Sequence, residues 1–92
     1  MHDRLTRIED ITETLARSPL AKSGRVTQDE LVMDAALADL LFEKKAALEI
    51  RKDAAPDKSF DCRSYNELLM SVAEVVAGIR DFELKYGVQL MA

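Results

Sequence analysis

Residues 27–52 read TQDELVMDAALADLLFEKKAALEIRK, and this stretch decides the fold. It predicts one long helix, over about residues 28–53, in which Asp34 and Asp39 are the only charged residues between Leu31 and Phe42. A helix with one apolar stripe needs one neighbour, whereas a helix that is apolar nearly all round must be covered from several sides or lie inside an assembly. We therefore expect this helix to lie at the centre of the protein.

The helix begins with a clear start signal and carries two apolar faces. Thr27 and Glu30 have the spacing of a capping box, in which the threonine hydroxyl and the glutamate carboxylate each bind a free backbone amide. On a helical wheel the first face comprises Met33, Leu37, Leu40, Leu41 and Leu48, and the second comprises Leu31, Ala35, Phe42 and Ala46. Two apolar faces predict two sets of neighbours.

Shorter signals on either side predict two more helices. Apolar residues at spacings of three and four predict a helix over about residues 3–17, which ends at Ser18-Pro19 because proline disfavours helical geometry in the preceding residue. A similar pattern predicts a helix over about residues 65–86, started by a second capping box at Ser64 and Glu67. The longest predicted loop therefore runs from residue 53 to residue 63.

The carboxyl terminus carries a helix-ending signal. Gly87 follows the third predicted helix, where glycine commonly adopts a left-handed conformation, and Val88 is placed to fold back on Phe82. We expect residues 89–92 to fray because chain ends are poorly ordered unless something holds them.

These elements predict an all-α fold. We expect a three-helix bundle built on an antiparallel hairpin of helices 28–53 and 65–86, with helix 3–17 packed across it, in one domain of residues 1–92. A chain of 92 residues buries only a limited share of its surface on folding. Together with the nearly all-apolar central helix, this predicts a dimer.

Composition and charge restrict the function. The formal net charge is −4, with acidic and basic residues interspersed, so no basic stripe is available for phosphates and nucleic-acid binding is disfavoured. Cys62 is the only cysteine, which excludes an intramolecular disulfide and fits a reducing compartment. The amino terminus has no signal-peptide pattern, and no apolar run has the length of a membrane span. We expect a soluble cytoplasmic protein.

No set of residues has the pattern of a catalytic or metal site. His2 is the only histidine and lies at the chain end, and Cys62 is interpreted as a packing residue in a loop. Asp34 and Asp39 are interpreted as ion-pairing residues between helices, with Lys44, Lys45 or arginines of the first helix as partners. We assign no catalytic residue, no cofactor and no metal, and we predict that the chain is not an enzyme.

The sequence thus favours a small protein-interaction module, such as an adaptor, a chaperone-like protein or a regulatory subunit, that acts through an apolar helix face. The predicted interaction residues are Leu31, Ala35, Asp39, Phe42 and Ala46. The expected partner is another protein or a second copy of the chain in a homodimer. We expect no nucleic acid, no membrane and no small-molecule ligand.

Two alternatives stay open. The first is a small helical enzyme with a cationic site between subunits, because the chain resembles the intertwined helical chorismate mutases in size and helix count. Arg4, Arg7 and Arg17 of the first helix and the pair Lys44 and Lys45 are the cations available for such a site, and the resemblance assigns none of them a role. The second alternative is an acidic phage-type inhibitor that masks a basic surface, as its size and negative charge suggest.

Overall fold

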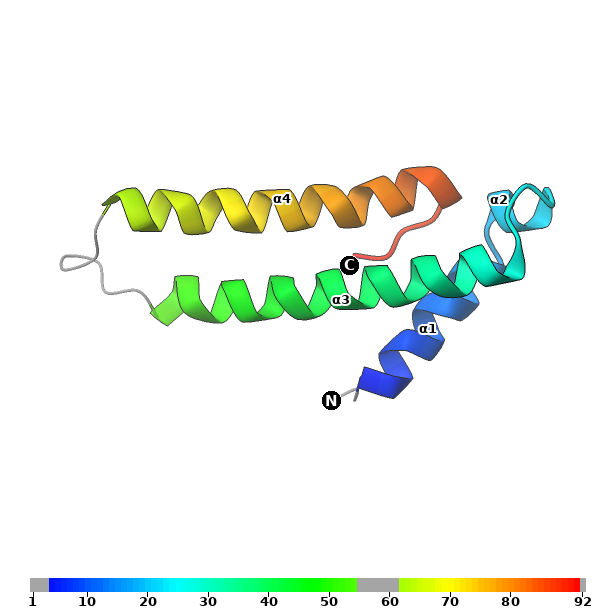
Figure 1. Ribbon diagram of the computed structural model, residues 1–92, viewed down its shortest axis with the longest axis horizontal. Helices are drawn as coiled ribbons and strands as arrows, with labels where there is room; N and C mark the ends of the chain where they lie inside the picture. The colour runs from blue at the N-terminus through cyan, green and yellow to red at the C-terminus, as the bar shows by residue number, and fades with distance from the viewer. Residues whose placement is uncertain (1–3, 55–61, 92) are drawn as a thin grey trace.

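The computed structural model describes residues 4–54 and 62–91, and all regular secondary structure in these two ranges is helical (Figure 1). The helices are α1 (Arg4–Ala16), α2 (Pro19–Lys22), α3 (Gln28–Ala54) and α4 (Cys62–Tyr86). The prediction of an all-α chain is confirmed. None of the helices in the described ranges is long and apolar enough to cross a membrane.

Helices α3 and α4 form the long axis of the molecule. They lie side by side and run in opposite directions (Figure 1), in a chain that measures 52 × 25 × 20 Å. The buried residues between them are Leu48, Leu68, Val75 and Ile79. Gly78 of α4 lies so close to Leu41 that a Cβ atom at Gly78 would be 3.1 Å from Leu41 Cδ1. The missing side chain at Gly78 thus lets the two helices approach closely.

Helix α1 crosses the amino-terminal half of α3 and leaves the rest of the hairpin to α3 and α4 (Figure 1). The buried residues of this second core cluster are Ile11, Leu15, Leu31, Ala35, Ala38 and Tyr86. One side of α3 therefore packs on α1 and another on α4. Near residues 54 and 62, the described part of the chain has only α3 and α4, with no third helix packed on them (Figure 1).

The short helix α2 was not predicted from the sequence. Ser18 does end α1, but its buried side chain also begins α2: its hydroxyl donates to the carbonyl of Leu15 at 2.5 Å and accepts from the amide of Ala21 at 3.2 Å. Pro19 then occupies the first helical position, where its missing amide hydrogen is no loss. One serine thus caps two helices that meet at an angle.

The predicted helix starts are partly correct. Thr27 caps α3 as expected, since its hydroxyl accepts a hydrogen bond from the amide of Glu30 at 3.0 Å. Helix α4 begins at Cys62, ahead of the predicted cap at Ser64, so Ser64 belongs to the first turn. His2 and residues 55–61 of the predicted loop lie outside the described residues, as does the side chain of Cys62.

The prediction that residues 89–92 fray is wrong for Leu90 and Met91. Gly87 adopts the expected left-handed conformation, with φ of 71°, and turns the chain back along α4. The Glu83 carboxylate then accepts hydrogen bonds from the amides of Leu90 at 2.7 Å and Met91 at 2.9 Å. The Leu90 side chain packs against both core clusters. One carboxylate therefore holds the tail in a place that no local sequence pattern indicates.

Replacement of Gly87 by alanine tests this turn. We expect Gly87→Ala to lower the free energy of unfolding by about 1 kcal/mol, because a Cβ atom is strained at positive φ. The new atom would lie 3.5 Å from Pro19, an ordinary contact, so strain and not a clash determines the loss. Urea denaturation followed by circular dichroism measures it. Gly87→Asn is the control and should lose less, since asparagine tolerates this conformation; equal losses would contradict the explanation.

Candidate functional site

The most unusual surface of the molecule lies on α3. Four apolar side chains there are between 46% and 65% exposed. They are Val32, Met33, Leu37 and Leu40; the last three lie within about 60° of one another around the helix axis, and we call these three the α3 apolar face. Isolated exposed apolar residues are common on proteins, but a group of them within three turns of one helix is typical of a binding surface.

This face is exposed because α3 has more apolar residues than its two neighbours can cover. Leu31 and Ala35 are buried in the core cluster that α1 and α4 share, and Leu48 is buried against α4. The residues of the α3 apolar face lie on the remaining side of the helix, where neither α1 nor α4 packs. The nearly continuous apolar sequence of α3 thus leaves one side uncovered.

The predicted interaction residues lie elsewhere. Leu31, Ala35 and Asp39 are buried within the chain, and Phe42 is half-buried. Of the five, Ala46 alone is exposed. That these five residues bind a partner stays a prediction. The exposed leucines, Leu37 and Leu40, belong to the first face of the helical wheel and not to the second. Sequence periodicity separates the two faces and does not say which of them α1 covers.

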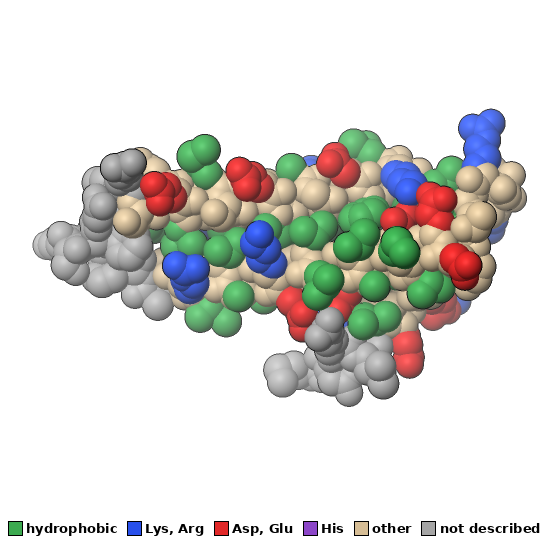
Figure 2. Space-filling view, in the orientation of Figure 1, with side chains coloured by type: hydrophobic (Ala, Val, Ile, Leu, Met, Phe, Trp, Pro, Cys, Tyr) green, Lys and Arg blue, Asp and Glu red, His purple; other side chains and the backbone are tan. Residues whose placement is uncertain are grey.

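Charged residues border the α3 apolar face. Lys44 and Arg51 continue along α3, while Glu67, Glu74 and Asp81 recur every seven residues on α4 and are exposed. Figure 2 shows that, toward the end of the hairpin near residue 54, acidic side chains follow α4 while basic and apolar side chains follow α3; near the start of α3, Glu30 and Lys85 have the reverse order. Over the part that carries Lys44 and Arg51, the two helices thus present opposite charges to the same side.

An ion pair between a partly exposed arginine and a buried aspartate joins α1 to α3. The Nε atom of Arg7 donates to Oδ1 of Asp39, whose side chain is fully buried, and Arg7 Nη2 lies 3.5 Å from Oε1 of Glu43. The hydrogen bond to Asp39 is the chief cause of a raised pKa for the Arg7 guanidinium. The predicted pairing of Asp39 with an arginine of the first helix is confirmed.

A second buried carboxylate joins α3 to α4. Oδ2 of Asp34 accepts hydrogen bonds from the Tyr86 hydroxyl at 2.5 Å and from Lys85 Nζ at 2.8 Å, and Lys85 also donates to Glu30 at 3.0 Å. The hydrogen bond to Asp34 chiefly raises the pKa of Lys85. Burial, followed by the same carboxylate, raises the pKa of Tyr86. The partners of Asp34 thus come from α4.

The lysines predicted as partners of these carboxylates have other surroundings. Lys45 Nζ lies 2.6 Å from Oε1 of Glu49, one turn along α3, and this contact lowers the pKa of Glu49. Lys44 is exposed on the side that carries the α3 apolar face. Lys44 and Lys45, two of the cations available for the site of the enzyme alternative, point to different sides of α3, since successive residues are about 100° apart.

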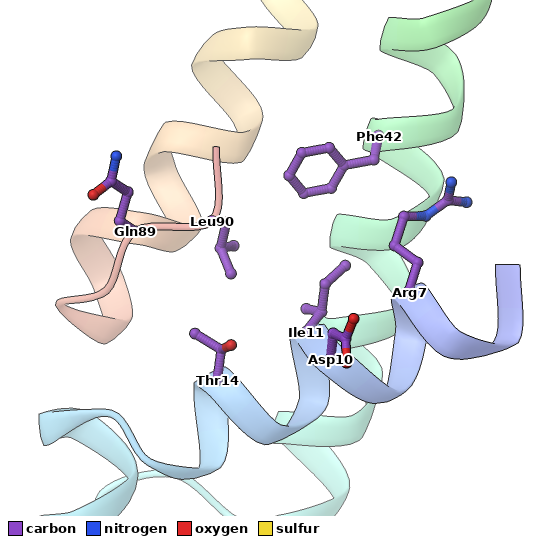
Figure 3. Close-up of a pocket in the computed structure, with 7 residues that line it drawn as sticks. All are labelled: Arg7, Asp10, Ile11, Thr14, Phe42, Gln89 and Leu90. Atoms are coloured by element: carbon purple, nitrogen blue, oxygen red, sulfur yellow. The ribbon is translucent and has the colours of Figure 1, made fainter. Parts of the chain in front are cut away.

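A cleft of about 270 Å³ lies where α1, α3 and the carboxyl-terminal tail meet (Figure 3). Phe42 and Leu90 face each other across it, and Ile11 and Thr14 rise from α1 at its side. The Arg7 guanidinium, at the edge, is directed toward α3 and away from the centre of the cleft. The cleft is thus mainly apolar, and its one cation is bound to Asp39.

Comparison of the chain with models of protein families, with curated proteins and with solved structures gives no match. Among the described residues, no three metal-binding side chains come together. The interpretation of the site therefore depends on its own geometry.

Removal of the Arg7 side chain tests the ion pair between α1 and α3. We expect Arg7→Ala to lower the free energy of unfolding by about 3 kcal/mol, because the buried Asp39 carboxylate loses a cationic partner. The matched control is Arg17→Ala, which removes an exposed ion pair to Glu13 and should change stability by less than about 0.5 kcal/mol. Urea denaturation compares them. Similar losses in the two variants would show that the buried pair adds nothing beyond an exposed one.

Alkaline pH should weaken the contact between α3 and α4. The folded-state pKa values of Lys85 and Tyr86 are raised, so their stabilisation is complete below the unfolded-state values near about 10 and is lost as the pH rises further. We therefore expect the free energy of unfolding to stay level from about pH 8 to about pH 9.5 and to fall as the pH rises from about 10 to about 11.5.

The variant Lys85→Met/Tyr86→Phe should show a smaller fall over the same pH range, because both titrating groups are removed. Lys22→Met, which changes an exposed lysine of α2, is the control and should keep the full fall. Urea denaturation at each pH provides the data. An equally large fall in the double variant would place the alkaline sensitivity elsewhere in the chain.

Proposed function

We propose that this chain is a small protein-interaction module that binds another protein chain through the α3 apolar face. The observation that carries the proposal is the exposure of Met33, Leu37 and Leu40 on one side of a helix whose sides toward α1 and α4 are packed. An apolar helix face of this kind gains free energy when a partner helix covers it, at about 25 cal/mol per Å² of apolar surface removed from water.

The spacing of the face fits a helical partner. Met33, Leu37, Leu40 and Lys44 follow one another at intervals of four, three and four residues, the pattern along which two helices pack side by side. Ala36 and Ala47 lie beside this line and are exposed, and their small side chains permit a close approach. An amphipathic helix of a partner could therefore pack on the α3 apolar face with its backbone close to α3.

Site-specific photo-cross-linking tests this function. A photoreactive amino acid at Leu40 should give adducts of discrete mass in cells that make the protein, because a bound chain lies against that position. The control position is Leu84, a leucine of α4 that is 81% exposed and lies apart from the α3 apolar face. We expect few adducts from Leu84. Equal labelling at the two positions, or none at Leu40, would contradict the proposal.

A further inference from the structure

We infer that the partner bound by the α3 apolar face is a second copy of this chain, packed so that α3 of each copy lies against α4 of the other. This inference rests on the proposed function and names its partner. Three features of the described residues support it: the extended shape of the chain, the exposed α3 apolar face, and the opposite charges on α3 and α4.

The shape of one chain leaves surface for an assembly. The Cα radius of gyration is 15.6 Å, whereas a compact chain of this length has a value of about 12 Å. The accessible surface is 6588 Å², about 1,200 Å² more than the roughly 5,400 Å² typical of a monomer of this mass. A stable complex buries about 800 Å² on each partner. A second hairpin of the same length would match this surface from end to end.

The register of the hairpin places its charges at matched heights. Asp34 meets Lys85, and Leu41 meets Gly78, so seven residues forward on α3 correspond to seven residues back on α4. Lys44 therefore lies within one residue, about 1.5 Å, of the height of Glu74 along the helix axis, and Arg51 lies within one residue of the height of Glu67. All four side chains are exposed, and Figure 2 shows both signs of charge on the same face of the molecule.

The charges select one of two symmetric arrangements. A two-fold axis parallel to the helices keeps every height unchanged and sets α3 of one copy on α4 of the other. Lys44 and Arg51 then approach Glu74 and Glu67 of the second copy, with favourable charge at both heights. An axis across the hairpin would instead set α4 on α4 and oppose the two acidic rows. Opposite charges therefore favour the parallel axis, and the product is a four-helix bundle with an apolar centre.

Sedimentation equilibrium over a wide range of dilution tests the second copy as partner. We expect the unaltered chain to have the mass of a dimer and Leu37→Asp/Leu40→Asp to have the mass of a monomer with an unchanged helical signal. Both leucines are about half exposed, so we expect the helices of one chain to tolerate the two aspartates. Leu84→Asp is the control and should stay dimeric. A dimer that survives both aspartates would overturn the assignment of this face.

Charge exchange tests the arrangement. Lys44→Glu/Arg51→Glu makes the facing surfaces of both helices acidic, and Glu67→Lys/Glu74→Lys makes both basic. Each variant alone should dimerise more weakly, by on the order of tenfold or more, because every charge pair becomes repulsive. An equimolar mixture should recover dimers that contain one copy of each variant. If the two variants dimerise as well alone as the unaltered chain does, the parallel axis is wrong.

The two proposals fail in different ways. A monomeric chain whose Leu40 position cross-links to a different protein of discrete mass would overturn the second copy as partner and leave the interaction function standing. A monomeric chain without adducts at Leu40 would overturn both. A dimer whose adducts at Leu40 have the mass of two chains supports both, because the same position then reports the same neighbour.

Discussion

The structure depends on two carboxylates buried on one helix. Asp34 and Asp39 are five residues apart on α3, which places them about 140° apart around the helix axis. Asp34 therefore reaches Lys85 and Tyr86 on α4, while Asp39 reaches Arg7 on α1. A buried charge is costly without partners, so each carboxylate favours the position of the neighbouring helix that brings its hydrogen-bond partners within reach. Apolar packing alone would restrict the positions of α1 and α4 on α3 less strictly.

With both neighbours fixed in this way, the surface of α3 divides into covered and uncovered sides. The sides that face α1 and α4 hold the core clusters around Leu15 and Ile79, and the side opposite α1 holds the α3 apolar face. The hairpin extends well beyond α1, so this chain has more surface than a compact monomer (Figure 1). The exposed leucines and the shape thus have one cause, a long central helix with too few covering elements.

The carboxyl-terminal tail partly makes up for this lack of covering elements, on the side of the hairpin away from the α3 apolar face. Glu83 binds the amides of Leu90 and Met91, and Leu90 then packs against both core clusters beside the cleft that Phe42 lines (Figure 3). This contact helps to explain why the side of α3 predicted to bind a partner is already occupied within the chain. The proposed binding surface and the tail therefore lie on different sides of α3, and a partner on the α3 apolar face leaves the tail in place.

The sequence by itself determined the helical class, the start of α3 at the Thr27 cap, the left-handed turn at Gly87 and an excess of apolar surface on α3, because periodicity and caps depend on neighbours within a few residues. It also indicated that Asp34 and Asp39 form ion pairs between helices. It identified the arginines of the first helix as partners, which is correct for Asp39, but it did not identify the α4 partners of Asp34. The tertiary structure decided which apolar face is covered, since that depends on the contact between Arg7 and Asp39 across 32 residues of sequence. It also decided the place of the tail through Glu83. Such contacts follow from how whole helices cross, which no local pattern encodes.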